Sequence, residues 1–190
     1  MGLHRHIFFV FDEAKATEAA CHILQRLNGR RDYFSLIKLL YLAERQSLIE
    51  NRWPIFGDAY ASLDHGPIVS TVYNIIKDDR DWLARKPRIW PAYIERIGQW
   101  DVLLKQPVVL QKLSPNDVAI LDAVVAEHGR KDWRELRRFT HSLPEYQDPQ
   151  GSSIPILPDE ILSIAGASEE EIKDIRLDAD AFRHMFAAAS

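Results

Sequence analysis

The sequence predicts a mainly α (α+β) fold: a compact helical domain with one or two small β-hairpins. Several segments place apolar residues at the three-and-four spacing of an amphipathic helix, and most of them follow a capping residue. Short β-prone runs around glycine-containing turns predict the hairpins. A chain of 190 residues suffices for one core and contains no domain-scale linker, so we expect a single domain over residues 1–190.

The first two helices are marked by their starting residues. Asp12 precedes an apolar stripe that ends at Asn28-Gly29, where positive φ angles are tolerated. Asp32 or Ser35 begins the second helix, which carries LIKLLYLAER at residues 36–45. Because its apolar positions widen beyond one stripe, we expect this helix to be central.

The next segment, residues 53–74, reads WPIFGDAYASLDHGPIVSTVYN. Pro54 biases Trp53 to an extended conformation, and Gly57-Asp58 between two apolar runs predicts a hairpin. Gly66-Pro67 then predicts the start of a third helix, since proline in the first turn loses no hydrogen bond. Residues 78–86 follow as a charged, solvated connection.

A second hairpin is predicted over residues 93–97 and 100–104, around Gly98-Gln99. Ser114-Pro115 begins a further helix, which stops at Gly129. Asp132 and Glu135 then form a capping box for the next one.

The last 48 or so positions begin with a proline-rich stretch, residues 143–158, that is typical of an irregular loop. A capping box at Ser168 and Glu171 follows, and it opens a helix with heptad-like spacing. We expect residues 151–190 to form a helical extension that packs on the domain or serves a homodimer.

Composition narrows the classes of function. Apolar residues make up 46% and charged residues 27%, as in soluble globular proteins. The net charge of −4 argues against nucleic acid as a partner bound by a broadly basic surface. The apolar run at residues 7–11 is too short for a signal peptide or a membrane span. We therefore expect a cytoplasmic protein without membrane attachment.

No pattern of residues indicates catalysis. Phosphate-binding glycine motifs and the nucleophile elbow are absent from the sequence. Seven histidines make no H-E-x-x-H pair and only one cysteine is present, so no metal or cofactor is predicted. We predict a protein that is not an enzyme. A hydrolase with a site around Asp58 and His65 stays open as an alternative.

A second alternative is a DNA-binding regulator. Residues 114–142 have the order of a helix-turn-helix, and the second helix carries Arg134, Arg137 and Arg138. Such side chains can meet phosphates or base edges. Acidic residues at the start of this helix dilute its charge, and a solvated helix pair explains the same pattern.

Three motifs, in order, carry a resemblance to a known family. They are the KLLY helix, the block from Pro54 to the G-P pair, and a T-H-x-x-P element, and they comprise Lys38, Tyr41, Pro54, Gly57, Asp58, Ala61, Gly66, Pro67, Thr140, His141 and Pro144. Over roughly residues 14–150 the chain resembles the Panacea domain, the SocA-like antitoxin family of bacteria and phages. The order and spacing of the motifs carry this resemblance more than any single one.

The resemblance implies a non-enzymatic protein that neutralises a cognate toxin by direct contact. It also implies a AAA+ protease as a further partner, because one family member is similar to an adaptor that delivers its toxin to such a protease. Aromatic and loop residues are the candidate partner-binding residues: Trp53, Phe56, Tyr60, His65, Leu143 and Tyr146. The alternative, that these aromatic side chains are simply core, is equally open at this point.

Overall fold

The computed structural model describes residues 6–78 and 87–189, and these form eight helices and two small three-stranded antiparallel sheets. The predicted mainly helical fold with small β elements is confirmed. The helices are α1 Glu13–Arg26, α2 Tyr33–Asn51, α3 Ser70–Lys77, α4 Trp90–Tyr93, α5 Pro115–His128, α6 Trp133–His141, α7 Pro158–Ile164 and α8 Glu169–Ala189. The strands are β1 Arg30–Asp32, β2 Tyr60–Leu63, β3 Gly66–Val69, β4 Ile94–Ile97, β5 Asp101–Leu104 and β6 Ile154–Ile156.

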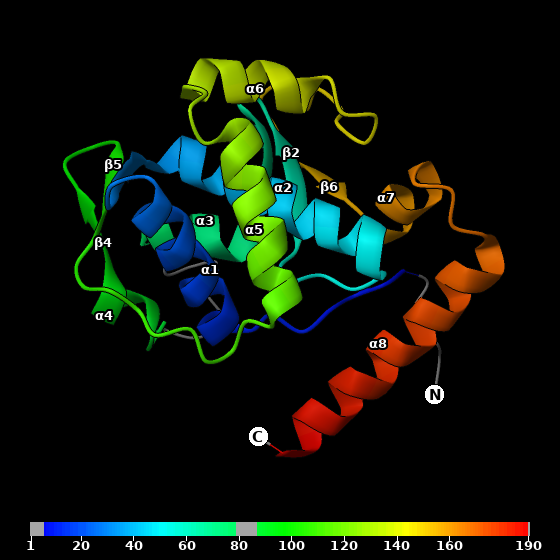
Figure 1. Ribbon diagram of the computed structural model, residues 1–190. Helices are drawn as coiled ribbons and strands as arrows, with labels where there is room; N and C mark the ends of the chain where they lie inside the picture. The colour runs from blue at the N-terminus through cyan, green and yellow to red at the C-terminus, as the bar shows by residue number, and fades with distance from the viewer. Residues whose placement is uncertain (1–5, 79–86, 190) are drawn as a thin grey trace.

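Helix α2 runs through the middle of the molecule, as its apolar composition predicts (Figure 1). It contacts α1, α5, α6, α7 and strand β3, so its side chains are buried on several faces. Burial on all sides is the arrangement expected of a helix whose apolar residues exceed one stripe. Much of the core therefore packs on the helix that carries the KLLY motif.

The predicted capping residues begin their helices. The Asp12 carboxylate accepts the backbone N–H of Lys15 at 3.0 Å, and Asp32 accepts that of Ser35 at 2.8 Å. Helices α5 and α6 begin with reciprocal capping boxes at Ser114 and Asp132. These contacts satisfy backbone donors that a helix start leaves unpaired.

The two sheets have the strand orders β1-β5-β4 and β3-β2-β6. The predicted hairpin around Gly98-Gln99 is confirmed, because β4 pairs with β5 with Ile97 opposite Asp101. Strand β1, directly before α2, pairs with the other edge of β5. This sheet lies at one end of the molecule, at the left in Figure 1.

The hairpin predicted around Gly57-Asp58 is wrong in position. The paired strands are β2 and β3, and the turn between them is Asp64-His65. Gly66-Pro67 accordingly lies in a strand, with Pro67 opposite Ser62, and the helix begins only at Ser70. Proline is tolerated here because β3 is an edge strand. The N–H that Pro67 lacks would not have been needed for a ladder bond.

The segment 143–158, predicted to be an irregular loop, contains more structure than expected. Strand β6 within it pairs with β2, and Pro158 opens helix α7. Pro155 is again accommodated on an edge strand. The predicted connection at residues 78–86 lies outside the described residues except for Asp78, the left-handed C-cap of α3.

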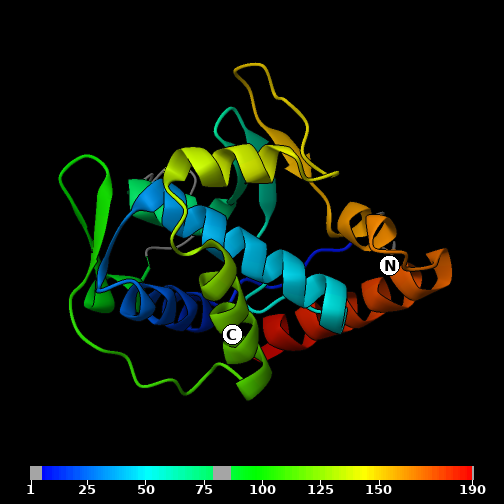
Figure 2. The same ribbon diagram turned by 45° about the horizontal axis from the view of Figure 1, so that its top comes forward.

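Helix α8 leaves the body of the molecule at an angle, as Figures 1 and 2 show. Its first half is tied down by ion pairs of Glu171 with Arg52 at 2.8 Å and of Arg176 with Asp159 at 2.8 Å. Ile175 is buried here, so this half of the helix contacts the rest of the chain. None of the helices in the described part of the chain is long and apolar enough to cross a membrane.

Candidate functional site

The three sequence motifs meet at Gly66, the first residue of β3. Its φ of +96° suits glycine, and a Cβ there would lie 2.8 Å from Thr140 Oγ1, 3.1 Å from His141 Cδ2 and 3.2 Å from Lys38 Cε. Residues of the KLLY helix and of the T-H pair thus pack directly against the glycine of the G-P pair. The glycine is needed both for its backbone angle and for this close approach.

Lys38 is 2% exposed, and its ammonium donates a 2.6 Å hydrogen bond to the carbonyl oxygen of Pro67. Burial, and secondly the nearby Arg137 guanidinium, lower the pKa of Lys38 to about 7. No described carboxylate forms an ion pair with it. The site therefore holds a buried amine that is partly neutral near pH 7.

The second motif block is organised by Glu44, which sequence analysis did not single out. Its buried carboxylate accepts the backbone N–H groups of Phe56 at 2.8 Å and Gly57 at 3.1 Å, and the hydroxyl of Tyr60 at 3.1 Å. Burial raises the pKa of Glu44 to about 7, against the opposing effect of these donors. Gly57 has a φ of +71°, and a Cβ would lie 2.6 Å from the carbonyl oxygen of Val10.

Asp58, next in the motif, holds the start of helix α3 from a distance. Its carboxylate accepts the backbone N–H groups of Thr71 at 2.8 Å and Val72 at 3.0 Å. Burial raises its pKa to about 6. A carboxylate facing the positive end of a helix is a favourable arrangement, so Asp58 takes the role that a neighbouring cap residue usually has.

Tyr41 and Arg45 connect the KLLY helix to the third motif through Glu145. The Tyr41 hydroxyl donates to Glu145 Oε1 at 2.8 Å, and Arg45 Nε donates to the same oxygen at 2.6 Å. The side chain of Glu145 is fully buried, so its interactions with Tyr41 and Arg45 lie inside the fold. Burial, then the neighbouring Glu145, raises the pKa of Tyr41 well above its usual value.

The T-H-x-x-P element closes over the β2–β3 hairpin. Thr140 Oγ1 donates to the carbonyl oxygen of Leu136 at 2.9 Å, and the His141 ring stacks on Tyr146 with centroids 4.1 Å apart. The Tyr146 hydroxyl donates to the carbonyl oxygen of Leu63 at 3.3 Å. His141 Nε2 is buried without a described partner, and burial lowers the pKa of this histidine.

The remaining motif residues differ in their exposure. Pro54 and Ala61 are buried, and Pro144 lies on the exposed loop after α6. The motifs thus contain three buried polar contacts, those of Lys38, Glu44 and Glu145, and their segments pack together at Gly66. Buried polar groups with specific partners favour one arrangement of the segments they join.

A family model described as the SocA-like antitoxin Panacea domain matches residues 36–147. The chain belongs to the SocA-like Panacea antitoxin family. No curated protein and no solved structure matches the chain. The match begins at the KLLY helix and ends just after the T-H-x-x-P element, so the three contacts above lie within the Panacea domain. Membership gives a general role in a toxin–antitoxin system and favours a non-enzymatic protein.

The predicted partner-binding residues are not all on the surface. Phe56 and Tyr60 are 1% and 3% exposed, so they are core residues and offer a partner no surface in this conformation. Their burial follows from the Glu44 carboxylate, which draws the loop and the Tyr60 hydroxyl inward. The alternative of simple core packing holds for these two side chains.

Of the other four candidates, Leu143 and Tyr146 are neighbours, since the Tyr146 N–H donates to the Leu143 carbonyl oxygen at 3.1 Å, whereas Trp53 lies at α8. Trp53 is half-buried and packs edge-to-face on Phe182 of α8, with ring centroids 6.1 Å apart. Leu143 and Tyr146 are half-buried, and Tyr146 serves the hairpin as described. His65, at the β2–β3 turn, is exposed. The structure therefore does not bring the six predicted residues together on one face.

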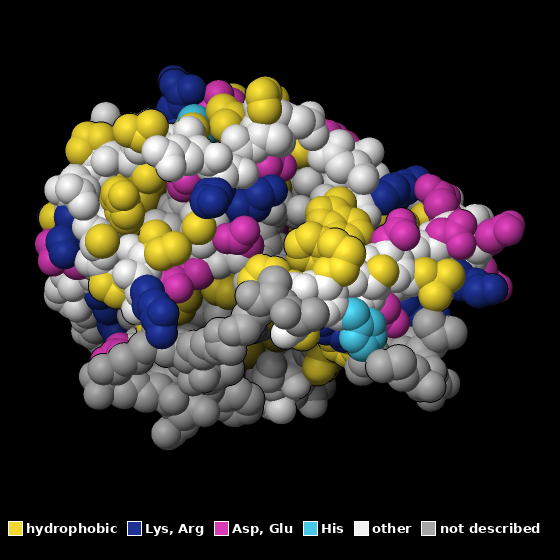
Figure 3. All heavy atoms as spheres, turned by 90° about the horizontal axis from the view of Figure 1, so that it is seen from below, with side chains coloured by type: hydrophobic (Ala, Val, Ile, Leu, Met, Phe, Trp, Pro, Cys, Tyr) yellow, Lys and Arg dark blue, Asp and Glu magenta, His cyan; other side chains and the backbone are white. Residues whose placement is uncertain are grey.

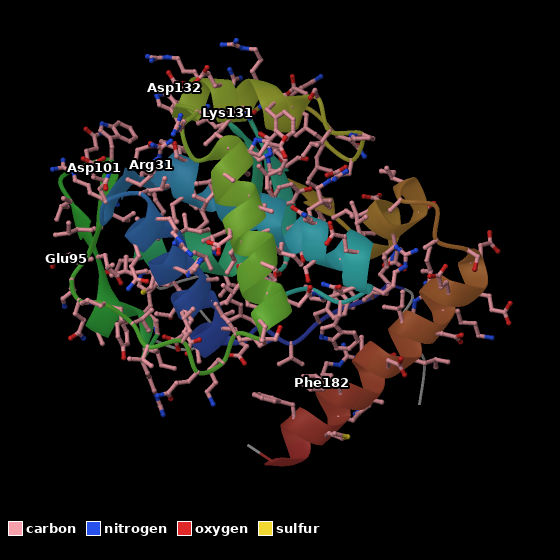
Figure 4. The ribbon with its side chains drawn as sticks, in the orientation of Figure 1. Arg31, Glu95, Asp101, Lys131, Asp132 and Phe182 are labelled. Carbon is pink, nitrogen blue, oxygen red and sulfur yellow. The ribbon has the colours of Figure 1, made fainter. Side chains whose placement is uncertain are left out.

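The three arginines of the DNA-binding alternative have different environments. Arg137 donates to the carbonyl oxygen of Asp64 at 3.0 Å and so supports the hairpin turn. Arg134 lies over the ring of Trp133, 4.8 Å from its centroid. Arg138 is exposed. In Figure 4, Lys131 and Asp132 lie close to Arg31, whose guanidinium donates to the Lys131 carbonyl oxygen, so the start of α6 is held against β1.

The alternative hydrolase site gains no support from this geometry. The Asp58 carboxylate is 3% exposed and accepts three backbone N–H groups, whereas His65 lies on an exposed turn. No contact between the two is described. Among the described residues, histidine, cysteine and acidic side chains form no cluster that could hold a metal ion.

Glu44, Arg45 and Glu145 were not predicted as site residues, although the sequence contains a signal for the first two. Positions 38, 41, 44 and 45 recur at helical spacing in an otherwise apolar segment. Polar residues on the buried face of a helix require partners, and this requirement could have identified them. Glu145 lies 100 positions from Arg45, and nothing local indicates their contact.

Proposed function

We propose that this protein is an antitoxin that neutralises a cognate toxin by direct contact. The family match over residues 36–147 carries this proposal. The packing at Gly66 supports it, because residues of all three family motifs lie against one another there. Direct contact needs an exposed surface, and the described surface offers a distinct apolar one.

That surface is the α8 patch, defined as Phe182, Met185 and Phe186. These side chains are 44%, 69% and 52% exposed, and Trp53 adjoins them through its contact with Phe182. Figure 3 shows hydrophobic side chains gathered on this side of the molecule, and Figure 4 shows Phe182 on the side of α8 that faces the body. Clustered exposed aromatic residues are typical of protein interaction sites.

Co-expression with the adjacent gene tests the proposal. The product of that gene should arrest growth alone, and growth should recover when this protein is produced with it. The two proteins should also co-purify as a stable complex. A harmless neighbouring protein that does not co-purify would contradict the assignment.

The double variant Met185→Ser, Phe186→Ser tests the α8 patch. Both side chains are exposed, so folding should be retained while toxin binding weakens by about tenfold or more. Val109→Ser is the matched control, because Val109 is 76% exposed and distant in sequence. Equal neutralisation by the double variant and the control would exclude the α8 patch as the contact, leaving the antitoxin function to be judged by co-expression.

Delivery of the toxin to a AAA+ protease, homodimerisation and a cytoplasmic location stay predictions. An adaptor would lower the toxin level only in cells that contain the protease, whereas inhibition by binding leaves the level unchanged. The same co-expression strains distinguish these outcomes. The molar mass of the purified protein in solution decides whether it is a homodimer.

A further inference from the structure

A cavity of about 190 Å³ lies between helix α2 and the β2–β3 hairpin. Ile37, Leu63 and Ile68 contribute apolar walls, and Lys38 and His65 contribute basic groups. The one acidic lining residue, Asp64, uses Oδ1 to accept the backbone N–H of Gly151 at 2.9 Å. Binding pockets for whole drug-sized ligands measure roughly 300–1,000 Å³, so this cavity suits a single small group.

At the cavity, the Lys38 ammonium has no described anionic partner. The Lys38 ammonium has three donors and one described acceptor, the carbonyl oxygen of Pro67. The charged group that most affects it is the Arg137 guanidinium, which repels it. A lysine that is 2% exposed in such surroundings gains strongly from an added anion. Lys38 therefore offers an anionic group at the cavity the N–H donors that Pro67 does not use.

We define an aromatic rim as Phe34 and His65 together with Trp100 and Trp133, whose rings pack on these two. Phe34 and His65 line the cavity itself. Phe34 stacks with Trp100 at 5.8 Å between centroids, and His65 lies 6.2 Å from Trp133. Trp100 is 50% exposed, which leaves stacking surface for a planar ligand.

We propose that the cavity and the aromatic rim bind a small aromatic anion, with its phosphate or carboxylate toward Lys38 and its ring against the rim. The apolar walls exclude water from the anion, and the rim adds the stacking area that the cavity itself lacks. Nearby cations, Arg134 over Trp133 and Arg137 beside the turn, add favourable potential. The inference does not rest on the antitoxin function, since neither Lys38 nor the rim belongs to the α8 patch.

Calorimetry on the full chain, with nuclear magnetic resonance to locate the ligand, tests the proposal. Adenosine 5′-monophosphate and benzoate are the two anionic probes, and adenosine and inorganic phosphate are the matched half-ligands. At least one anionic probe should bind at millimolar concentration or below and shift the resonances of His65 and Trp133. Binding of the nucleotide alone identifies a phosphate ligand, and binding of benzoate alone identifies a carboxylate ligand.

Three outcomes overturn the proposal. The first is that neither anionic probe binds. The second is that adenosine binds as tightly as its monophosphate, which removes the role of the anion. The third is that inorganic phosphate binds as tightly as the nucleotide, which removes the role of the rings.

Variants locate the site. Lys38→Met should weaken binding by about tenfold or more, as the loss of a charge-assisted hydrogen bond predicts. Ser152→Phe places a ring at the cavity from an exposed loop position and should block binding with Lys38 intact. Lys112→Met, at an exposed position outside the cavity, should bind as the native chain does. If Lys38→Met fails to fold, undiminished binding by Ser152→Phe overturns the proposal.

Discussion

The Lys38 ammonium donates its 2.6 Å hydrogen bond to the carbonyl oxygen of Pro67, which joins the central helix to the edge strand of a three-stranded sheet. Pro67 cannot donate to a ladder, but its carbonyl remains available, and Lys38 uses it. The Panacea motifs KLLY and G-P are therefore complementary parts of one contact. This relationship makes the stability of the protein depend on the charge of a single buried amine.

We predict that stability rises with pH through the titration of Lys38. Its pKa of about 7 in the folded protein lies below the ordinary 10.5, so between these values the unfolded chain holds a proton that the folded chain has lost. The free energy of unfolding should therefore increase by up to about 1.4 kcal/mol per pH unit in this range, and this contribution should be flat at lower pH. Urea unfolding at several pH values between about 7 and 9 measures it.

Lys38→Met provides the comparison for that measurement. The variant lacks the titrating group, so the difference between native and variant chains should change with pH, while all other groups cancel. Parallel curves for the two proteins would show that Lys38 titrates normally and would contradict the lowered pKa. Lys112→Met, at an exposed position, should run parallel to the native chain.

Gly66→Ala should destabilise the protein more than its backbone angle alone explains. The added methyl group meets Thr140 Oγ1 at 2.8 Å and also strains a φ of +96°. Gly151→Ala is the matched control, with a φ of +83° and no atom within 4 Å. We expect a loss of about 1 kcal/mol for the control and about 2–4 kcal/mol for Gly66→Ala. Thermal unfolding gives both values, and equal losses would show that the three motifs do not meet closely here.

Glu145→Ala should cost about 2–4 kcal/mol of stability, since it leaves Arg45 and the Tyr41 hydroxyl without their acceptor. Tyr41→Phe, which removes one of these bonds, should cost about 1–2 kcal/mol. Chemical denaturation measures both. The exposed pair of Arg30 and Asp101 serves as the reference, and Arg30→Ala should change stability by less than about 1 kcal/mol. A comparable loss at both pairs would argue against a special role for the buried one.

The DNA-binding alternative is best tested without Arg137. That side chain supports the Asp64 turn, so its substitution would confuse loss of fold with loss of DNA contact. The double variant Arg134→Ala, Arg138→Ala keeps the turn intact. If α6 reads DNA, the native chain should shift a fragment of its own promoter at low salt and the variant should not. We expect neither protein to shift the fragment. A shift by the native chain that the variant does not produce would support the DNA-binding alternative.

Local signals allowed much of the helical framework to be predicted. Asp12, Asp32, Ser114 and Asp132 each bind amides within three residues, so the information for these helix starts is contained in a few neighbouring positions. The hairpin at Gly98-Gln99 is equally local. The central place of α2 followed from its apolar composition, a property of the same segment.

The predictions were wrong where a local sequence pattern was compatible with two different structures. Gly66-Pro67 suits a helix start and an edge strand alike, and only the pairing of Pro67 with Ser62 decides between them. The turn predicted at Gly57 is wrong: the residue has a positive φ, but its amide bonds to Glu44, 13 positions away, rather than closing a hairpin. The candidate site depends on such contacts, which explains why its motif residues were recognised while Glu44, Arg45, Glu145 and the geometry were not.

Helix α3 has no side-chain cap of its own, because its N-cap residue is Val69. The carboxylate that serves it belongs to Asp58, on the far side of the hairpin. Helix and hairpin should accordingly open as one cooperative unit, because the helix loses its terminal acceptor as soon as the hairpin separates. Amide hydrogen exchange at Thr71 and Val72 should therefore measure the opening of the hairpin. The exchange of these two amide protons then gives the free energy at which this part of the Panacea domain opens.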